Sequence, residues 1–107
     1  MDDHYAISTV AEAGGVRIQL AGDIDLVAVP AIASEIDSAL TGDASAIRID
    51  LSKVTFIDSS GIGALLTGLH RATEAGRAYT AAGAHGLAER VLTIAGVADY
   101  LADPETR

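Results

Sequence analysis

One short segment, IDSSGIG at residues 57–63, separates two different hydrophobic periodicities. Before it, apolar and polar residues alternate from Ile47 to Leu51, which is the period of a β-strand. After it, apolar residues from Ile62 to Leu69 recur at three- and four-residue spacing, which is the period of an amphipathic helix. The sequence therefore predicts a strand-to-helix corner, and a fold that contains it must place a helix directly after a buried strand.

Two serines, Ser59 and Ser60, fall at this corner, at or just before the first helical turn. A helix start has unbonded backbone N–H groups and the positive end of the helix dipole, so a phosphate on a serine is favoured there. Serine is also a preferred N-cap, and capping is its ordinary use. Gly61 and Gly63 each weaken a helix by roughly 1 kcal/mol relative to alanine, so this pair indicates backbone left open to a partner.

Residues 50–63, DLSKVTFIDSSGIG, resemble the signature of the STAS domain family, and specifically that of its single-domain bacterial anti-sigma factor antagonists. The resemblance extends to LAGDID at residues 20–25, which matches the family's acidic loop, and to residues 84–97, which match its last helix and turn. Nearly the whole chain is covered. The resemblance implies a single STAS domain over residues 1–107, with an α/β fold in which α-helices cover a mixed β-sheet.

The resemblance also implies a mechanism. The unphosphorylated antagonist binds a kinase-type anti-sigma factor and so releases a sigma factor; the anti-sigma factor uses ATP to phosphorylate the antagonist, and a PP2C-type phosphatase resets it. The family's phosphate acceptor directly follows the motif aspartate, which makes it Ser59 here. Supporting roles in the phosphosite and in partner binding are implied for Asp58, Ser60, Gly61, Gly63, Asp23 and Asp25.

A different assembly is the alternative function. A STAS domain can be a scaffold module of a stressosome-like or phospholipid-transport assembly, without a phosphorylation switch.

The family usually has a final helix after the last strand, and the tail Ala102–Arg107 is too short for a stable helix. A surface that this helix normally covers is then exposed or used to form a homodimer.

The composition restricts the partners and the compartment. The net charge of −8 argues against direct nucleic-acid binding, which needs lysine and arginine. No apolar run approaches the ~20 residues of a membrane helix, and the start Met1–His4 lacks the basic segment of a signal peptide, so we expect a cytoplasmic protein. The absence of cysteine excludes disulfides and thiolate metal sites. We expect no metal and no cofactor.

Other reactive residues do not fit a catalytic site. Asp23 and Asp25 are similar to the Asp-x-Asp nucleophile of phosphotransferases, but those enzymes are larger and need a lysine and further carboxylates. Asp58 at a strand end is similar to the phosphoacceptor of a receiver domain. That chemistry needs an acidic pair after the first strand and a lysine late in the chain, and no lysine follows Lys53. Ser59 lacks the Gly-x-Ser-x-Gly context of a hydrolase, and the three histidines lack metal-ligand spacing. The chain is therefore expected to bind rather than catalyse.

The remaining pattern gives the order of the elements. Strands are predicted at residues 4–11, 16–20, 47–51 and 78–82, and helices at about 29–41, 60–75 and 85–95. Gly14 and Gly15 predict a hairpin turn between the first two strands. Residues 22–25 are predicted to form a loop, and residues 97–101 an edge strand.

Overall fold

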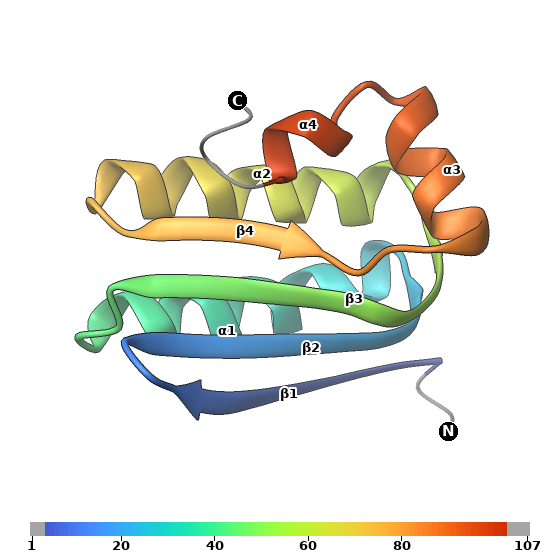
Figure 1. Cartoon of the computed structure of the whole chain (residues 1–107). Coiled ribbons are helices and arrows are strands. Elements are labelled where there is room, and N and C mark those ends of the chain that lie inside the picture. Colours follow the sequence, from blue (N-terminus) through green and yellow to red (C-terminus); the bar gives the residue numbers. More distant parts are fainter. Residues whose placement is uncertain (1–3, 103–107) are drawn as a thin grey trace.

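The computed structural model describes residues 4–102, in which strands and helices alternate after an initial hairpin (Figure 1). The elements are β1 (Tyr5–Glu12), β2 (Gly15–Ile24), the 3₁₀ helix η1 (Leu26–Ala28), α1 (Val29–Thr41), β3 (Ala46–Ile57), α2 (Ser59–Glu74), β4 (Ala78–Ala82), α3 (Gly86–Ile94) and α4 (Ala98–Leu101). The predictions made for the chain start and the C-terminal tail fall on residues 1–3 and 103–107, outside the described residues.

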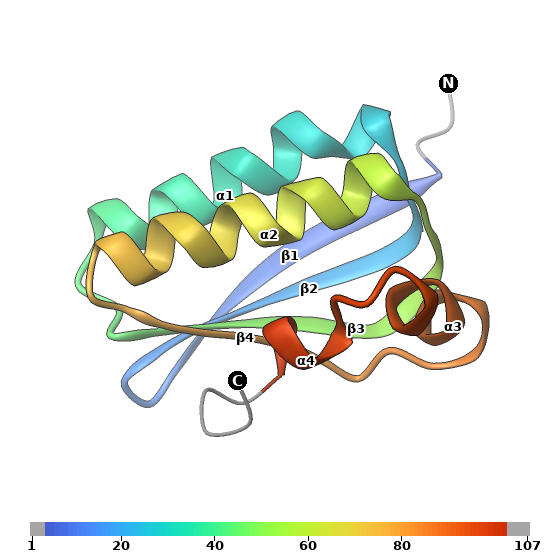
Figure 2. The same cartoon turned by 90° about the horizontal axis from the view of Figure 1, so that it is seen from above.

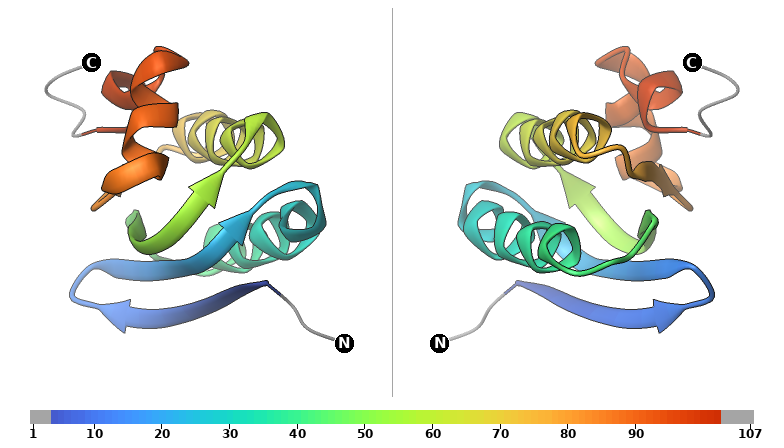
Figure 3. Two further views of the ribbon diagram at one scale, coloured as in Figure 1. Left: turned by 90° about the vertical axis from the view of Figure 1, so that its right-hand side faces the viewer. Right: turned by 90° about the vertical axis from the view of Figure 1, so that its left-hand side faces the viewer.

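The strands form one sheet in the order β1-β2-β3-β4. β1 is antiparallel to β2, whereas β2, β3 and β4 are mutually parallel and joined through α1 and α2. Figure 2 shows α1 and α2 side by side over one face of the sheet. Figure 3 shows α3 and α4 near the β4 edge, with β1 at the opposite edge. The predicted mixed sheet covered by helices is confirmed.

The core lies between this sheet and the helices, and it is almost entirely aliphatic. Alternation along β3 turns Ile47, Ile49 and Leu51 inward, and each is at most 2% exposed. Tyr79 of β4 is buried among them, and its hydroxyl donates a hydrogen bond to the carbonyl oxygen of Leu65 at 2.8 Å. Burial raises the pKa of Tyr79, so the hydroxyl stays a donor.

The predicted loop at residues 22–25 is wrong, because β2 continues to Ile24. Gly22 has a φ of 82° and lies at an irregularity of the β2–β3 ladder, where it still pairs with Val54 on one side and Tyr5 on the other. A Cβ at this position would lie 2.2 Å from the carbonyl oxygen of His4. The glycine therefore permits a β-bulge between two neighbouring strands rather than a turn.

Two further boundaries differ from the prediction. β3 extends beyond residue 51 to Ile57, because its second half pairs with the extension of β2. Residues 98–101 form the short helix α4 instead of an edge strand. Helical spacing brings Val97 and Leu101 to one face, where Leu101 is buried at 1% exposure and Val97 packs against the core.

Candidate functional site

The neighbouring parallel strands β2 and β3 both end in isoleucine, and aspartate follows each of them. Ile24 pairs with Ile57 in the ladder, and the backbone N–H of Asp58 donates to the carbonyl oxygen of Ile24 at 3.3 Å. Because parallel strands end at the same edge of a sheet, Asp25 and Asp58 lie at one edge. Each of them begins the helix that follows its strand.

Asp58 is the N-cap of α2. Its Oδ1 accepts hydrogen bonds from the backbone N–H groups of Ser60 at 2.9 Å and Gly61 at 3.1 Å, and its carbonyl oxygen accepts from Ile62 at 2.9 Å. Neither serine of the corner caps the helix, although serine is a preferred N-cap, because the carboxylate of Asp58 has that role. The N–H groups of Ser60 and Gly61, which a bound anion would use, are likewise already bonded to this carboxylate.

The two serines differ in their surroundings. Ser59 is the first residue of α2 and its side chain is exposed. Ser60 is half-buried and lines a groove between α1 and α2. Since Asp58 supplies the cap, the hydroxyl of Ser59 is not needed to begin the helix and is accessible from solvent.

The two glycines of the corner have different functions in the structure. A Cβ on Gly61 would lie 2.5 Å from the carbonyl oxygen of Ile24 and 2.7 Å from Cγ1 of Ile57, so glycine is required where α2 meets the strand ends. A Cβ on Gly63 would meet no atom within 4 Å. The sequence interpretation of an open backbone therefore applies to Gly63, whereas Gly61 is a packing residue.

The acidic residues at the end of β2 and just after it also make defined contacts. Asp23 Oδ1 accepts a hydrogen bond from the hydroxyl of Thr55 at 3.0 Å. Asp25 caps η1, with Oδ1 accepting from the N–H of Val27 at 3.1 Å and Oδ2 lying 2.8 Å from Nε2 of His4. No local pattern indicates the His4 contact, because the two residues are 21 positions apart. Asp25 therefore fixes η1 beside the corner.

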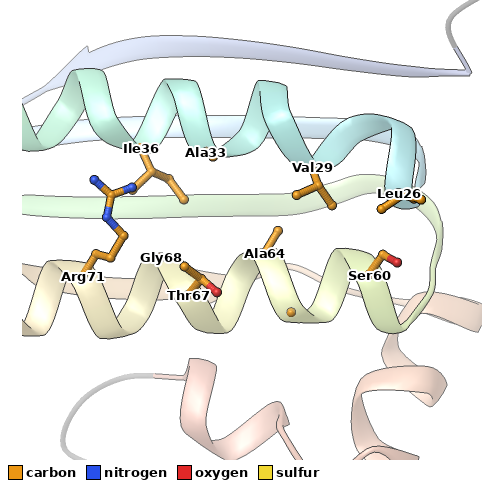
Figure 4. Close-up of a pocket in the computed structure, with 10 residues that line it drawn as sticks. Leu26, Val29, Ala33, Ile36, Ser60, Ala64, Thr67, Gly68 and Arg71 are labelled. Carbon is orange, nitrogen blue, oxygen red and sulfur yellow. The ribbon is translucent and has the colours of Figure 1, made fainter.

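A groove of about 290 Å³ runs between α1 and α2 next to the corner (Figure 4). Its lining is mostly small and apolar: Leu26, Val29, Ala33, Ile36, Ser60, Gly63, Ala64, Thr67, Gly68 and Arg71. Leu26 and Ser60 lie at one end, and Arg71, which is paired with Asp37, lies at the other. The groove thus opens beside the α2 N-terminus.

Exposed apolar side chains surround the same end of the groove. Leu26 and Val27 of η1 are 69% and 59% exposed, although both are large aliphatic residues. Because the carboxylate of Asp25 caps this turn, it holds both side chains in place, and Leu26 lines the groove together with Ser60. The arrangement joins an accessible hydroxyl, a fixed carboxylate and an apolar surface, which suits recognition of a protein.

Between residues 4 and 102, no three His, Asp or Glu side chains come together in a way that could hold a metal ion. His70 pairs with Glu74 and His85 contacts the carbonyl oxygen of Ser52, so both lie apart from His4. Across that range no helix has the length and apolar character needed to cross a membrane.

Comparison with known proteins gives the family. A family model described as "Mlab, STAS domain" matches residues 7–103, so the chain belongs to the STAS domain family. No curated protein sequence matches the chain.

Solved structures of anti-sigma factor antagonists share the fold. One from Mycobacterium paratuberculosis is 25% identical, with a TM-score of 0.75, and the match covers 94% of this chain and 86% of that one. The phosphorylated form of the Bacillus cell fate determinant SpoIIAA is 26% identical, with a TM-score of 0.64 and coverages of 86% and 85%. The unphosphorylated form of the antagonist SpoIIAA has a TM-score of 0.76 at 23% identity, with coverages of 87% and 83%, and shows the fold alone.

Proposed function

We propose that this protein is an anti-sigma factor antagonist whose unphosphorylated form binds a kinase-type anti-sigma factor and thereby releases a sigma factor. Phosphorylation of Ser59 switches the binding off, and a PP2C-type phosphatase restores it. The observation that carries the proposal is the exposed Ser59 at the first position of α2, next to a cap that Asp58 already provides. We place this activity in the cytoplasm and in one STAS domain.

The similar structures support this choice among STAS functions. The similar protein from Mycobacterium paratuberculosis is an anti-sigma factor antagonist, and the similar Bacillus structure is SpoIIAA in its phosphorylated form. Both matches cover more than four-fifths of each chain. A phosphorylated state of a similar fold supports a phosphorylation switch in this chain.

The electrostatics of the corner supply a mechanism for the switch. A phosphate adds a charge of about −1.5 to −2 and three acceptor oxygens. The N–H groups of Ser60 and Gly61 are already bonded to Asp58, so the new phosphate gains few helix donors and lies next to an existing carboxylate. The charge of the phosphate therefore stays on the surface that contacts the partner. A tenfold loss of affinity needs only ~1.4 kcal/mol, so one phosphate is sufficient.

The docking surface lies beside the phosphate acceptor. Leu26 and Val27 present apolar area that a partner can bury, and Gly63 leaves the α2 backbone open to close approach. Asp25 supports this surface through its hydrogen bond to the N–H of Val27. Asp23 and Gly61 act indirectly, by fixing the strand ends on which the corner is built.

The proposal is tested by calorimetric titration of candidate kinase-type anti-sigma factors from the same genome, in the absence of ATP. Ser59→Ala should bind with the affinity of the wild type, and Ser59→Asp at least tenfold more weakly. Thr73→Asp is the matched control, because it adds the same charge to an exposed position near the other end of α2. Equal affinity of Ser59→Asp and the wild type would contradict the switch.

A STAS subunit of a larger assembly, such as a stressosome-like or phospholipid-transport complex, is the second candidate. The observation that favours it is the description of the matching family model, which names Mlab rather than an antagonist. In this case Ser59 would remain unphosphorylated, and the protein would bind a partner that is not a kinase with equal affinity in the wild type and in Ser59→Ala. Co-purification from the native organism, followed by identification of the bound proteins, distinguishes the two candidates.

Both candidates are binding functions, and we infer that the protein acts without turnover. The two aspartates that are similar to a phosphotransferase motif already have hydrogen-bond partners. Asp23 accepts from the hydroxyl of Thr55, and Asp25 contacts the N–H of Val27 and the ring of His4. Hydrolysis of ATP or GTP that co-purifies with the folded protein, and that persists after removal of contaminating kinases, would contradict this inference.

A further inference from the structure

Among the described residues, no other strand pairs with the outer edge of β1. Within residues 4–102, β2 is the only strand that pairs with β1, and β1 forms the outer border of the sheet in Figure 3. Natural proteins usually protect such an edge with proline, lysine, a bulge or a covering element. β1 spans eight residues, pairs with β2 without a register shift, and contains neither proline nor lysine. Such an edge is suited to pairing with another strand.

The direction of the free backbone groups follows from the ladder. The N–H of Asp23 donates to the carbonyl oxygen of His4 at 2.9 Å, so His4 belongs to the set of residues that exchange hydrogen bonds with β2. In an antiparallel ladder such residues alternate with residues whose N–H and C=O groups point the other way. The backbone groups of the residues between them therefore point outward from the sheet edge: Tyr5, Ile7, Thr9 and Ala11.

We propose that a second copy of this chain pairs with β1 in the antiparallel direction, with Ser8 opposite Ser8 of the partner subunit on a two-fold axis. In this register Ile7 lies opposite the partner's Thr9, and Tyr5 lies opposite the partner's Ala11. All four residues with outward backbone groups then exchange hydrogen bonds. Opposed residues also lie on the same face of the sheet. Side chains alternate between the two faces along a strand, and each opposed pair consists of two odd-numbered or two even-numbered residues. The result is one continuous sheet through both copies.

The side chains and charges of β1 are compatible with this pairing. Val10 is 47% exposed on the face opposite α1 and α2, and the register places it against Ala6 of the partner subunit. The carboxylate of Glu12 is balanced by Arg48 at 2.8 Å and by Arg17 at 3.3 Å. These two ion pairs limit the repulsion between two copies at the Glu12 end of the edge. Another carboxylate beside β1, Glu35 of α1, accepts a hydrogen bond from the hydroxyl of Thr9 at 2.7 Å.

This interface is separate from the proposed Ser59 site. The helix α2 packs against β3 and β4, on the side of the sheet away from the β1 edge. A dimer formed through β1 therefore leaves the N-terminus of α2 accessible in both copies. The inference does not depend on phosphorylation or on the identity of the partner protein.

Cysteine cross-linking tests the register directly, because the chain has no cysteine of its own. Ser8→Cys would place two thiols on directly opposite residues about 4.5 Å apart in Cα, within the range for a disulfide. Ala6→Cys would place its two thiols four residues apart along the strands, about 14 Å, which is too far. We expect a disulfide-linked dimer for Ser8→Cys, none for Ala6→Cys, and one for a mixture of Ala6→Cys and Val10→Cys.

Sedimentation equilibrium tests the interface without a covalent link. The wild type should change with concentration from the mass of one chain, 10.9 kDa, toward twice that value. Ser8→Lys places two positive charges opposite each other on the two-fold axis and should lower the dimer affinity at least tenfold. Mixing this variant with Ser8→Asp places opposite charges there and should restore the dimer. Ser34→Lys, an exposed position on α1, is the control and should leave the affinity unchanged. A monomer at all concentrations, or a dimer insensitive to Ser8→Lys, would overturn the proposal.

Discussion

Asp58 donates its backbone N–H to the carbonyl oxygen of Ile24, and this 3.3 Å hydrogen bond connects the start of α2 to the end of β2. The same contact brings together two caps, because Asp25 begins η1 one residue after Ile24 and Asp58 begins α2. The exposed apolar surface of η1 is therefore held at a fixed position beside Ser59. Under the proposed function, the strand pair aligns the docking surface with the phosphate acceptor.

The cap assigned to Asp58 predicts a difference between neighbouring variants. Asp58→Ala should lower the free energy of unfolding by about 1 kcal/mol, because the N–H groups of Ser60 and Gly61 lose their acceptor. Ser60→Ala removes a hydroxyl that does not cap the helix and should change it by less than about 0.5 kcal/mol. Urea unfolding followed by circular dichroism measures both values. Equal destabilisation by the two variants would contradict the assignment.

The two glycines of the corner should respond in opposite directions to alanine. Gly61→Ala should destabilise the fold by roughly 1–3 kcal/mol, since its Cβ would overlap the carbonyl oxygen of Ile24 and Cγ1 of Ile57. Gly63→Ala meets open space and should stabilise α2 by up to about 1 kcal/mol. Thermal unfolding of the two variants provides the comparison, and a destabilised Gly63→Ala would show that the α2 backbone is packed there.

The apolar surface of η1 should affect affinity without affecting stability. Leu26→Ser removes a side chain that is 69% exposed, so the melting temperature should be nearly unchanged. Its affinity for the anti-sigma factor should fall about tenfold, because interface centres depend on buried apolar anchors. Ile94→Ser, at an 82% exposed position on α3, is the control and should bind as the wild type does. Equal losses in both variants would place the docking surface elsewhere.

The pH dependence of stability should reflect Asp50. The backbone N–H of Ser52, followed by its hydroxyl and by Gln19 and Arg17, lowers the pKa of Asp50 to about 2. Because the folded pKa lies below the unfolded value of about 3.9, the carboxylate stabilises the fold above that value, and this contribution is lost as the pH falls toward 2.

Asp50→Asn measures this contribution. At pH 7 the variant should unfold more easily than the wild type by roughly 1–2 kcal/mol, because charged hydrogen bonds are lost. The difference should decrease between about pH 5 and pH 2, as the wild-type carboxylate becomes protonated. Urea titrations at several pH values provide the test. A difference that stays constant over this range would mean that the titration of Asp50 does not contribute to acid sensitivity.

The parts of the fold that the sequence predicted well are those with long, uniform periodicity. The alternation from Ile47 to Leu51 and the helical spacing from Ile62 to Leu69 each have one physical interpretation, and the corner between them follows. The course of β2 could not be read in the same way. Gly22 is a turn residue by local preference, and only its simultaneous pairing with β1 and β3 makes it a bulge.

The candidate site shows a similar division. The sequence indicated that residues 58–60 begin a helix, but aspartate and serine are comparable caps, so the capping residue depends on where the helix starts. That start is fixed by the tertiary contact between Asp58 and Ile24. The contact of His4 with Asp25 likewise arises from strand pairing and carries no local signal. Periodicity predicted the elements, whereas contacts between strands determined the site.

Intact-mass analysis with phosphosite mapping tests the central claim most directly. The protein and its Ser59→Ala variant are incubated with ATP and each candidate kinase-type anti-sigma factor from the same genome. We predict a single added phosphate, located on Ser59 and absent from Ser59→Ala. A folded wild-type protein that gains no phosphate with any candidate, or that gains it on another residue, would contradict the proposed switch.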